Sequence, residues 1–387
     1  MPDVLQNLLI YAGSFIVVLS VVVFVHEFGH FQVARWRKVA IDTFSIGFGK
    51  TLLGWRDRQG VQWKIGALPL GGYVKFADDA DAVSSGPREK IDDPAAMAEA
   101  RAKGLFHAQS LTTRSLVVAA GPTTNFIFAI FAFALLAFIV GREVPTRITA
   151  VAPDSAAEAA GLLPGDVILT VDGRPVANFQ ELQPIVAGAL GRSIDVVIQR
   201  GEQQITAQIT PRPSASNPSQ GSMGVAHDGS FEGRDRIGPL DAIAEGASNT
   251  WMIVAQTGAY IGAIFTGREN GNQIAGPIGI INVSGQVANS ALSAPGASLG
   301  ERVIMLALSL LQLAAVLSVA VGIVNLLPIP ILDGGHLLFY GIEALRGGKP
   351  LPPSAQEWAY RAGFAVMASL FLFATWNDIT RLFPGAQ

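Results

Sequence analysis

Residues 8–30 read "LLIYAGSFIVVLSVVVFVHEFGH". The first 18 of them, residues 8–25, carry no charge, and a helix of that length covers about 27 Å, close to the thickness of a bilayer's hydrocarbon core. A cleaved signal peptide is the alternative, but the preceding "MPDVLQN" holds an aspartate and no lysine or arginine, and the apolar run exceeds a usual signal sequence. The stretch therefore predicts a transmembrane helix that ends in two histidines and a glutamate.

Further uncharged runs have lengths that suit a membrane. Residues 115–140, 303–332 and 362–377 form runs of 26, 30 and 16 residues. The first two are long enough to span, whereas the third spans only if its charged flanks lie at an interface. Residues 246–267 form another uncharged run of 22 residues, but it contains Ser, Asn, Thr and Gln. Those side chains favour a helix that lies along the membrane surface.

The composition agrees with a membrane protein. Of 387 residues, 50% are hydrophobic and only 15% are charged, against about 25% charged in a typical soluble domain. The net charge of −3 and the pI near 6.0 give no basic footprint for nucleic acid. Because the chain has no cysteine, it has no disulfides or thiolate metal sites, and any metal must be held by His, Asp or Glu.

The distribution of lysine and arginine predicts the orientation. Residues 31–114 carry 13 of them, including "RWRK" soon after the first run, whereas the longer segment 141–302 carries 10. Positive residues are retained on the cytoplasmic side. We therefore expect the amino terminus outside, the histidine end of the first span facing the cytoplasm, and residues 141–302 outside again.

A β-rich module is predicted between the second and third spans. Its sequence alternates short β-branched runs with turn dipeptides such as Asp172-Gly173. The segment "AGLLPGDVILTVDG" resembles sequences of the PDZ family. Members of this family bind a peptide as an additional strand at the edge of a sheet. We place one PDZ-like domain at 143–213, followed by a linker and surface amphipathic helices at 214–300.

The two histidines at the end of the first span have metal-ligand spacing. On a helix, His26 and His30 lie on one face, so both imidazoles can reach one zinc ion while Glu27 reaches a water molecule. Three unpaired ionisable side chains at membrane depth would be costly. The pattern therefore predicts a zinc site with Glu27 as the catalytic base.

A catalytic zinc normally has a third protein ligand. Asp333 is an acidic residue that directly follows a membrane run, and a carboxylate there is a functional candidate. The alternative is a carboxylate at a helix terminus that binds the amides of a turn, since Gly334 and Gly335 follow. Spacing alone leaves the two interpretations open. The remaining histidines are weaker candidates as ligands: His107, His227 and His336.

Several motifs together resemble a known family. They are "VHEFGH", "FSIGFGK" at 44–50, "ALPLGGYVKF" at 67–76, "AAGPTTNFIFA" entering the second span, and "NLLPIPILDGGHLLF" at 325–339. In this order they are similar to the site-2 protease family of intramembrane zinc metalloproteases, in its bacterial sigma-E-protease-like branch. The resemblance implies that Asp333 is the third zinc ligand. Some members carry two PDZ domains, whereas this chain has one.

Substrate-binding residues are also expected. Asn325 could bind the substrate backbone or hold helices together, and the resemblance favours substrate contact. Pro328 and Pro330 end the helix and turn the chain towards the metal. Asn125 has the same ambiguity as Asn325, and we interpret it as structural.

The resemblance also points to a re-entrant β-hairpin within residues 60–76. Gly71 and Gly72 lie in this segment, and the edge of such a hairpin can pair with an extended substrate. The alternative is an ordinary cytoplasmic hairpin.

The number of membrane crossings follows from the requirement that His26 and Asp333 lie on the same side of the membrane. If the run 246–267 also crossed, Asp333 would emerge on the face opposite His26, so that run is best placed on the outer surface of the membrane, with a spanning helix as the alternative. We therefore predict a polytopic α-helical membrane protein with about four transmembrane helices, a membrane-associated β-hairpin and an inserted β-rich PDZ-like domain. The expected parts are a first transmembrane pair (1–140), the PDZ-like domain (143–213), the linker region (214–300), and the last two spans (301–387).

The predicted function is hydrolysis of peptide bonds within or near the membrane segments of single-span proteins. By resemblance, substrates are anti-sigma factors already shortened by another protease, or remnant signal peptides. Expected partners are these proteins, a peptide ligand of the PDZ-like domain and the lipid bilayer, with no nucleic acid. The expected location is the bacterial inner membrane. The alternative is a membrane PDZ scaffold with a structural zinc site; a zinc transporter is disfavoured because no second ligand cluster is evident.

Overall fold

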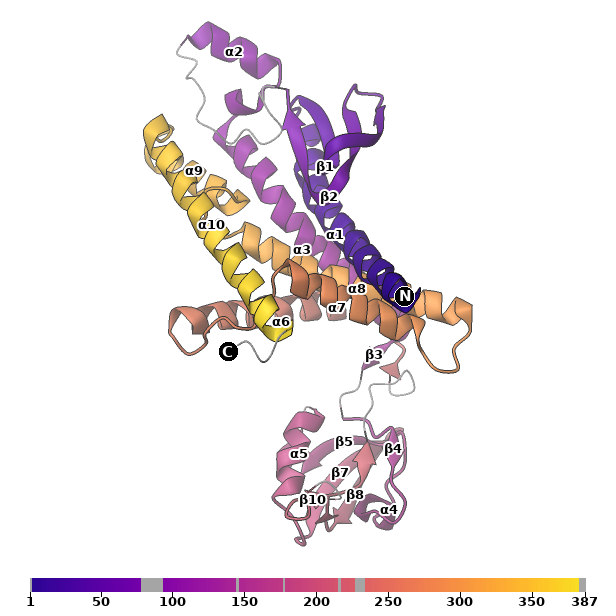
Figure 1. Ribbon diagram of the computed structural model, residues 1–387. Helices are drawn as coiled ribbons and strands as arrows, with labels where there is room; N and C mark the ends of the chain where they lie inside the picture. Colours follow the sequence, from indigo (N-terminus) through magenta and orange to yellow (C-terminus); the bar gives the residue numbers. More distant parts are fainter. Residues whose placement is uncertain are drawn as a thin grey trace. The chain divides into compact units, whose positions relative to one another are not determined.

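A computed structural model describes residues 2–77, 93–143, 146–176, 178–214, 217–226 and 234–382. The chain divides into two compact units, Met1–Phe133 with Gly246–Gln387, and Ala134–Glu245. The first unit is mainly helical and the second is rich in β-strands (Figure 1). His227, one of the histidines weighed as a metal ligand, lies outside the described residues.

The first unit is built from long apolar helices. Its helices are α1 (Pro2–Trp36), α2 (Pro94–Ala102), the 3-10 helix η1 (Phe106–Ala108), α3 (Leu111–Val140), α6 (Pro239–Phe265), α7 (Pro277–Leu292), α8 (Leu299–Asn325), α9 (Asp333–Leu345) and α10 (Pro353–Leu382). The far end of α3 and the beginning of α6 belong to the second unit. Within the described residues, four segments are long and apolar enough to cross a membrane: Gln6–Trp36, Leu111–Val140, Leu299–Asn325 and Pro353–Arg381.

These four segments overlap the four predicted spans. The apolar run 362–377 has only 16 residues, but it lies inside α10, a helix of 30 residues. The helix is therefore long enough to cross a membrane although its apolar run is short. The helix α6 contains most of the run 246–267 and is not among the four candidate spans of the described residues. Its exposed apolar side chains include Trp251 and Phe265.

The third predicted span is shorter than we expected. The uncharged run extends to residue 332, but α8 ends at Asn325 and the following residues form turns. Pro328 and Pro330 have no backbone N–H to donate, so a helix cannot continue through them. Hydropathy alone therefore places the carboxyl end of this span seven residues too late, and Asp333 follows an irregular segment instead of a helix end.

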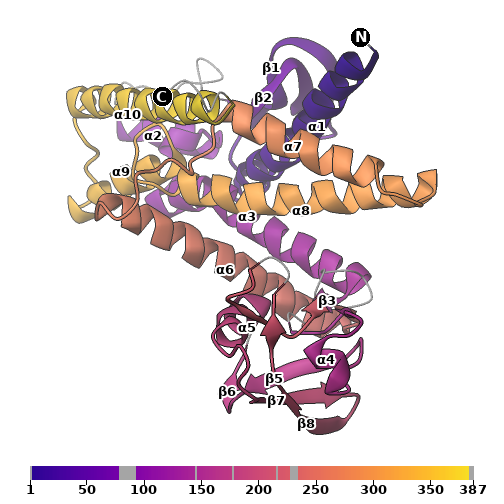
Figure 2. The same ribbon diagram turned by 60° about the horizontal axis from the view of Figure 1, so that its bottom comes forward.

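Helices α1, α7 and α8 pack against one another, and Figure 2 shows α7 and α8 side by side. Val18 and Val22 of α1 are buried against Ala314 of α8. A second junction joins α10 to α7, where Asp378 accepts hydrogen bonds from the backbone N–H groups of Gly276 (3.0 Å) and Gly279 (2.8 Å). A carboxylate satisfies the free N–H groups at a helix start and complements the helix dipole. Asp378 therefore caps α7 from another helix.

The β-hairpin is larger than predicted. It consists of β1 (Ile41–Arg56) and β2 (Gln62–Phe76), so residues 60–76 supply one strand and not a complete hairpin. Both strands bend, and Ile46 pairs with Gly72 on one side and with Ile65 on the other. The segment 43–46 therefore lies between two segments of β2. Phe44 packs on Phe31 of α1 and anchors the hairpin to the helix that carries the histidines.

The second unit contains a four-stranded antiparallel sheet in the order β6-β5-β7-β8. Its strands are β6 (Arg174–Pro175), β5 (Val167–Val171), β7 (Ile194–Arg200) and β8 (Gln203–Ile209), with the helices α4 (Ala156–Ala159) and α5 (Phe179–Ala187). Short two-stranded sheets, separate from the four-stranded one, also belong to this unit: β3 (Arg142–Glu143) with β12 (Arg234–Asp235), β4 (Ala150–Val151) with β11 (Val225–Ala226), and β9 (Arg212–Pro213) with β10 (Gly221–Ser222).

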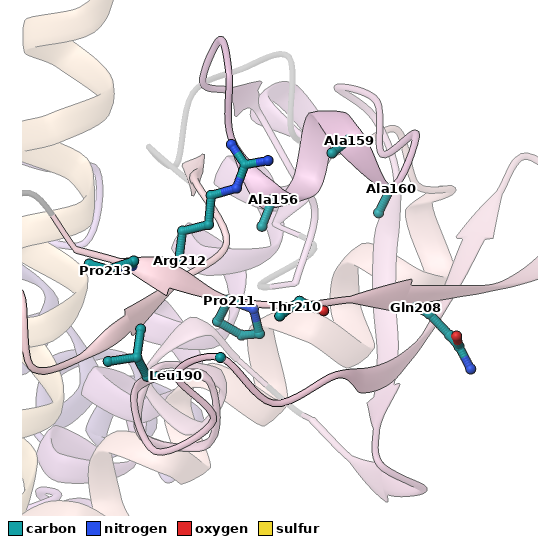
Figure 3. Close-up of a pocket in the computed structure, with 10 residues that line it drawn as sticks. Ala156, Ala159, Ala160, Leu190, Gln208, Thr210, Pro211, Arg212 and Pro213 are labelled. Carbon is teal, nitrogen blue, oxygen red and sulfur yellow. The ribbon is translucent and has the colours of Figure 1, made fainter.

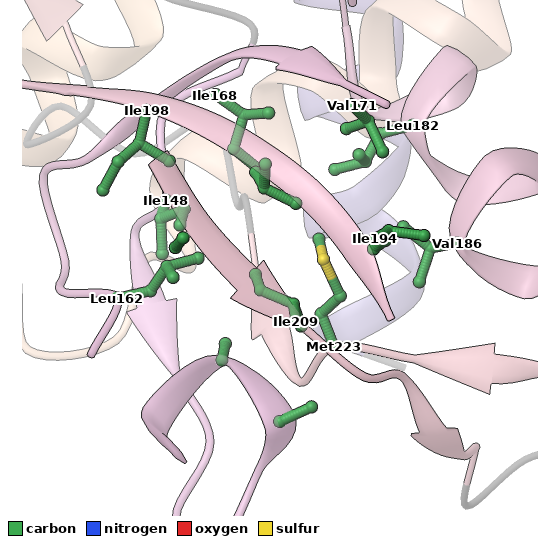
Figure 4. Packing of buried hydrophobic residues seen from close by; sticks show 14 of the residues in the cluster. Ile148, Leu162, Ile168, Val171, Leu182, Val186, Ile194, Ile198, Ile209 and Met223 are labelled. Carbon is green, nitrogen blue, oxygen red and sulfur yellow. The ribbon is translucent and has the colours of Figure 1, made fainter. Parts of the chain in front are cut away.

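Alternating side chains of this sheet form the core of the second unit. Ile168, Ile194 and Ile198 are buried together with Met223 (Figure 4). Asp166 is also buried and receives two hydrogen bonds of 2.7 Å from the guanidinium of Arg200. Burial raises the pKa of the Asp166 carboxyl, but these bonds and that from the Leu163 N–H outweigh it, and the pKa lies below its usual value.

Candidate metal centre and active site

Two histidines and one aspartate converge in the first unit. His26 and His30 lie one turn apart on α1, and their Nε2 atoms are 3.2 Å from each other. The Oδ2 atom of Asp333 lies 3.2 Å from Nε2 of His26 and 3.4 Å from Nε2 of His30. All three side chains are 84% or more buried, with exposures of 11%, 12% and 16%. Residues more than 300 positions apart in the chain thus meet at one point.

The turn before α9 brings Asp333 to this point. Asp333 is the first residue of α9, and Gly334 and Gly335 follow. A Cβ atom at Gly334 would lie 2.3 Å from the carbonyl oxygen of Leu327, and one at Gly335 would lie 2.3 Å from that of Ile329. Only glycine allows this close approach of the helix to the preceding turns.

The Oδ2 atom of Asp333 has the environment of a ligand rather than a cap. It is buried and has no hydrogen-bond partner among the described residues, so it does not bind the amides of the turn. An anionic oxygen that faces the lone pairs of two imidazole nitrogens is expensive unless a cation lies among them.

The spacing of these atoms fits zinc. A tetrahedral zinc holds nitrogen and oxygen ligands at about 2.0–2.2 Å, which places neighbouring ligand atoms about 3.3–3.6 Å apart. The three separations of 3.2, 3.2 and 3.4 Å are close to this value. Two imidazoles and one carboxylate also leave the fourth position open, as in catalytic zinc sites.

Glu27 lies beside the ligands without being one of them. In the described part of the chain, the cluster that could hold a metal contains His26, His30 and Asp333. Glu27 packs against the hairpin, because a Cβ atom at Gly72 would lie 2.9 Å from the Glu27 Cγ. The Glu27 side chain therefore lies against the hairpin, and Glu27 directly follows His26 on α1.

The helix α3 forms the other wall of the site. The His30 Nδ1–H donates to the carbonyl of Val117 (2.9 Å), and Nδ1 of His26 lies 3.2 Å from the amide nitrogen of Asn125. Between them, a Cβ atom at Gly121 would lie 2.3 Å from Nε2 of His30. Positions 117, 121 and 125 share one helix face, as do positions 26 and 30.

Sequence reasoning missed most of this wall. We interpreted Asn125 as structural, yet its side chain contacts a predicted ligand. The spacing of Gly121 and Asn125, equal to that of the two histidines, was the available signal. Val117 acts through its backbone, which gives no signal in the sequence.

The predicted substrate-binding residues lie around the site in different ways. Asn325 is the last residue of α8, and its Nδ2 donates to the carbonyl of Val321 in the same helix (3.0 Å). Pro328 is exposed, whereas Pro330 packs near Gly363 of α10. Gly72 contacts Glu27, and Gly71 has a positive φ of 136° beside Phe48. Their contact with substrate stays a prediction.

The other described histidines do not join the cluster. His336 lies against the rings of Phe339 and Tyr360, at 6.5 and 6.0 Å between centroids. His107 lies in η1. Neither belongs to the group of ligand atoms that converge.

A separate hollow of about 560 Å³ lies within the second unit. It is bordered by Ala156, Ala159 and Ala160 on one side and by Leu190, Pro211 and Arg212 on the other (Figure 3). The Arg212 guanidinium donates to the carbonyl of Asp154. The lining holds no histidine or carboxylate, so the hollow lacks the groups that metal-dependent hydrolysis requires.

Comparisons with known proteins agree with the geometry. Residues 14–370 match the model of peptidase family M50. A protein of Rhizobium meliloti, named as a candidate zinc metalloprotease, is 42% identical over 393 residues, covering 99% of this chain and 100% of that protein. The metalloprotease MmpA of Caulobacter vibrioides is 39% identical over 390 residues, covering 96% of each.

A solved structure is similar to a smaller part of the chain. It is the PDZ domain of an SdrC-like protein from Listeria monocytogenes, 19% identical, covering 22% of this chain and 87% of that domain. Its TM-score of 0.20 is too low to establish a shared fold. The family model and the relatives, in contrast, cover nearly the whole chain, and they show that the protein belongs to peptidase family M50, the site-2 protease family, and is a zinc metalloprotease.

Proposed function

We propose that the protein cleaves single-span membrane proteins within or near their transmembrane segments. The observation that carries this proposal is the position of the metal cluster. His26 and His30 belong to a helix long and apolar enough to cross a membrane, and α3, which covers them, is another such helix. A hydrolytic site between membrane helices suits a substrate that is itself a membrane helix.

The proposed topology has four spans. With the amino terminus outside, α1 ends in the cytoplasm at the basic "RWRK", α3 returns outwards, α8 runs inwards and α10 outwards. This order brings Asp333 to the cytoplasmic end of α8, the same side as His26. The second unit then lies outside the cytoplasm, with α6 along the membrane surface. We assign the protein to the bacterial inner membrane.

In the proposed mechanism, His26, His30 and Asp333 hold the zinc. When bound, zinc supplies a Lewis acid that polarises the scissile carbonyl and lowers the pKa of a water molecule. Glu27 accepts a proton from the attacking water and then delivers it to the leaving amine. One water is consumed, the C–N bond breaks, and Glu27 returns to its carboxylate form. No covalent intermediate with the protein is required.

The substrate must be extended before it can react, because a helix hides its amides in its own hydrogen bonds. The segment 72–76 of β2 pairs with β1 on one side only among the described strand pairs, and Gly72 lies against Glu27. We propose that an unwound substrate adds to this edge and so passes the base. Asn325, Pro328 and Pro330 would contact the substrate from the turn that carries Asp333.

The second unit would select the substrate. We propose that it is a PDZ-like domain that binds a peptide segment outside the cytoplasm. The proposal is based on the sequence "AGLLPGDVILTVDG" and on the antiparallel sheet. The substrates proposed are anti-sigma factors already shortened by a first protease, and remnant signal peptides. Cleavage of such proteins would release a cytoplasmic fragment.

Removal of the metal tests the proposal directly. Purified protein in detergent, given a model single-span substrate, is expected to lose cleavage when treated with a zinc chelator and to regain it when zinc is restored. The separation of cleavage products on a gel measures this. A substrate of the same length without a membrane segment serves as the control and should be cut poorly. Zinc binding without cleavage of any membrane substrate would favour a scaffold with a structural metal.

A further inference from the structure

We propose that Arg114 and Glu343 are positioning residues, whose ion pair holds α9 in the orientation that brings Asp333 to the zinc. The proposal rests on the proposed zinc site. Arg114 lies on α3 and Glu343 on α9. The guanidinium Nη2 donates to Oε1 of Glu343 at 2.6 Å, and Nη1 donates to Oε2 at 3.2 Å. The two side chains are only 17% and 10% exposed, so this contact between helices is largely shielded from solvent.

The contact restrains orientation as well as distance. A guanidinium and a carboxylate that share two parallel hydrogen bonds lie close to one plane. The Arg114 guanidinium also lies over the ring of Tyr340, with its central carbon 4.9 Å from the ring centroid. Tyr340 and Glu343 are three positions apart on α9 and therefore lie on one face. Arg114 thus contacts one face of α9 at two neighbouring points, which restrains rotation of the helix about its axis.

Rotation of α9 would displace the aspartate ligand. Asp333 is the first residue of α9, and the ion pair is about 15 Å further along the same helix. A ligand must be held within about 0.5 Å of its productive position. With side chains a helix has a radius of about 5–6 Å, so a rotation of about 5° moves an atom at its surface by that distance. The orientation of α9 therefore decides whether Asp333 can coordinate the metal.

The same part of α3 also contacts the helix of the two histidines. Nδ1 of His30 lies 2.9 Å from the carbonyl oxygen of Val117, and Val117 is one turn after Arg114 on α3. This turn of α3 therefore contacts α1, which carries two of the ligands, and α9, which carries the third. The position of Asp333 relative to the histidines is thus set through α3.

The alternative is an ion pair that stabilises the fold without affecting the metal, and two substitutions separate these roles. Removal of one partner leaves a buried charge and destabilises a protein, whereas apolar residues in place of both partners are often neutral or stabilising. The double variant Arg114→Met with Glu343→Leu therefore removes the oriented contact and leaves no charge unpaired. Arg114→Lys keeps the charge, but an ammonium group cannot form the planar two-point contact.

The experiment compares zinc affinity with folding stability in full-length protein in detergent. Competition with a chromophoric chelator measures the affinity, and thermal unfolding of the zinc-free protein measures the stability. Loss of residues that support metal ligands costs about 10- to 100-fold in metal affinity. We expect about 10-fold weaker zinc binding in Arg114→Lys and in the double variant, with unfolding temperatures close to that of the wild type.

Arg361→Lys is the matched control. Arg361 also pairs with a glutamate, Glu357, at 2.6 Å and also lies over an aromatic ring, that of Trp358. These contacts are exposed and lie within the single helix α10, so they do not orient one helix against another. We expect this variant to bind zinc like the wild type.

The absorption spectrum of the cobalt-substituted protein gives a second readout, because it reports the geometry of the ligands. It should change in Arg114→Lys and stay the same in Arg361→Lys. Wild-type zinc affinity and spectra in Arg114→Lys and the double variant would overturn the proposal. Losses of affinity that only follow losses of folding stability would also overturn it, because a purely structural ion pair behaves in that way. A wild-type protein that binds no zinc would overturn the proposed metal site itself, which keeps the two failures distinct.

Discussion

Glu27→Gln is expected to abolish peptide hydrolysis while the protein keeps its zinc. Glu27 lies beside His26 on α1 but outside the cluster of ligand atoms, so the substitution removes no ligand. Glutamine cannot take the proton of the attacking water, and loss of a general base costs about 10²- to 10⁴-fold in rate. Cleavage of a single-span substrate and the zinc content of the same preparation are the two measurements.

Glutamine is also a suitable replacement because it has nearly the same shape as glutamate. The contact with Gly72 is therefore kept, and the hairpin should remain in place. Cleavage at the wild-type rate would show that another group is the base. Loss of zinc together with activity would instead place Glu27 among the ligands.

Gly121→Ala is expected to abolish zinc binding, and with it all activity. The new methyl group would lie 2.3 Å from Nε2 of His30 and 2.9 Å from Cε1 of His26, so both imidazoles would have to leave their positions. The helix α3 cannot move away without breaking the bond from His30 to the carbonyl of Val117. Alanine favours helix more than glycine by about 1 kcal/mol, so a loss of zinc would not reflect a weaker helix. Metal analysis of the purified variant measures the effect.

Gly13→Ala is the matched control for this experiment. Gly13 lies on α1, the helix that carries both histidines, and a Cβ atom there would meet nothing within 4 Å. We expect this variant to bind zinc and cleave substrate like the wild type. If Gly121→Ala also bound zinc with wild-type affinity, α3 would not be the wall of the metal site.

The elements of this structure differ in how far the sequence predicts them. The spans follow from uncharged runs, and the two histidines from helical periodicity. The third ligand did not follow from spacing: Asp333 was one of two open interpretations until the family resemblance was used. Its contact with His26 depends on the turns at 326–332, where Pro328 and Pro330 end α8 before the apolar run does.

Contacts between residues that are far apart in the sequence were harder to predict than the spans. The strand that pairs with β2 is β1 (Ile41–Arg56), and β1 was not predicted. Asp378 directly follows the apolar run 362–377, and its side chain caps α7 about 100 positions earlier in the chain. Asn125 contacts His26 across 99 positions. Such pairs depend on which helix faces come together: the spacing of Gly121 and Asn125 shows that they share a helix face, but it does not show which helix that face contacts.

The position of the zinc tests the central claim most directly. Anomalous diffraction at the zinc absorption edge, from crystals of the full-length protein loaded with zinc, locates the metal without reference to any assay. We predict one strong peak among Nε2 of His26, Nε2 of His30 and a carboxylate oxygen of Asp333. A peak at the two histidines with Asp333 too distant to coordinate, or a peak elsewhere in the protein, would contradict the proposed active site.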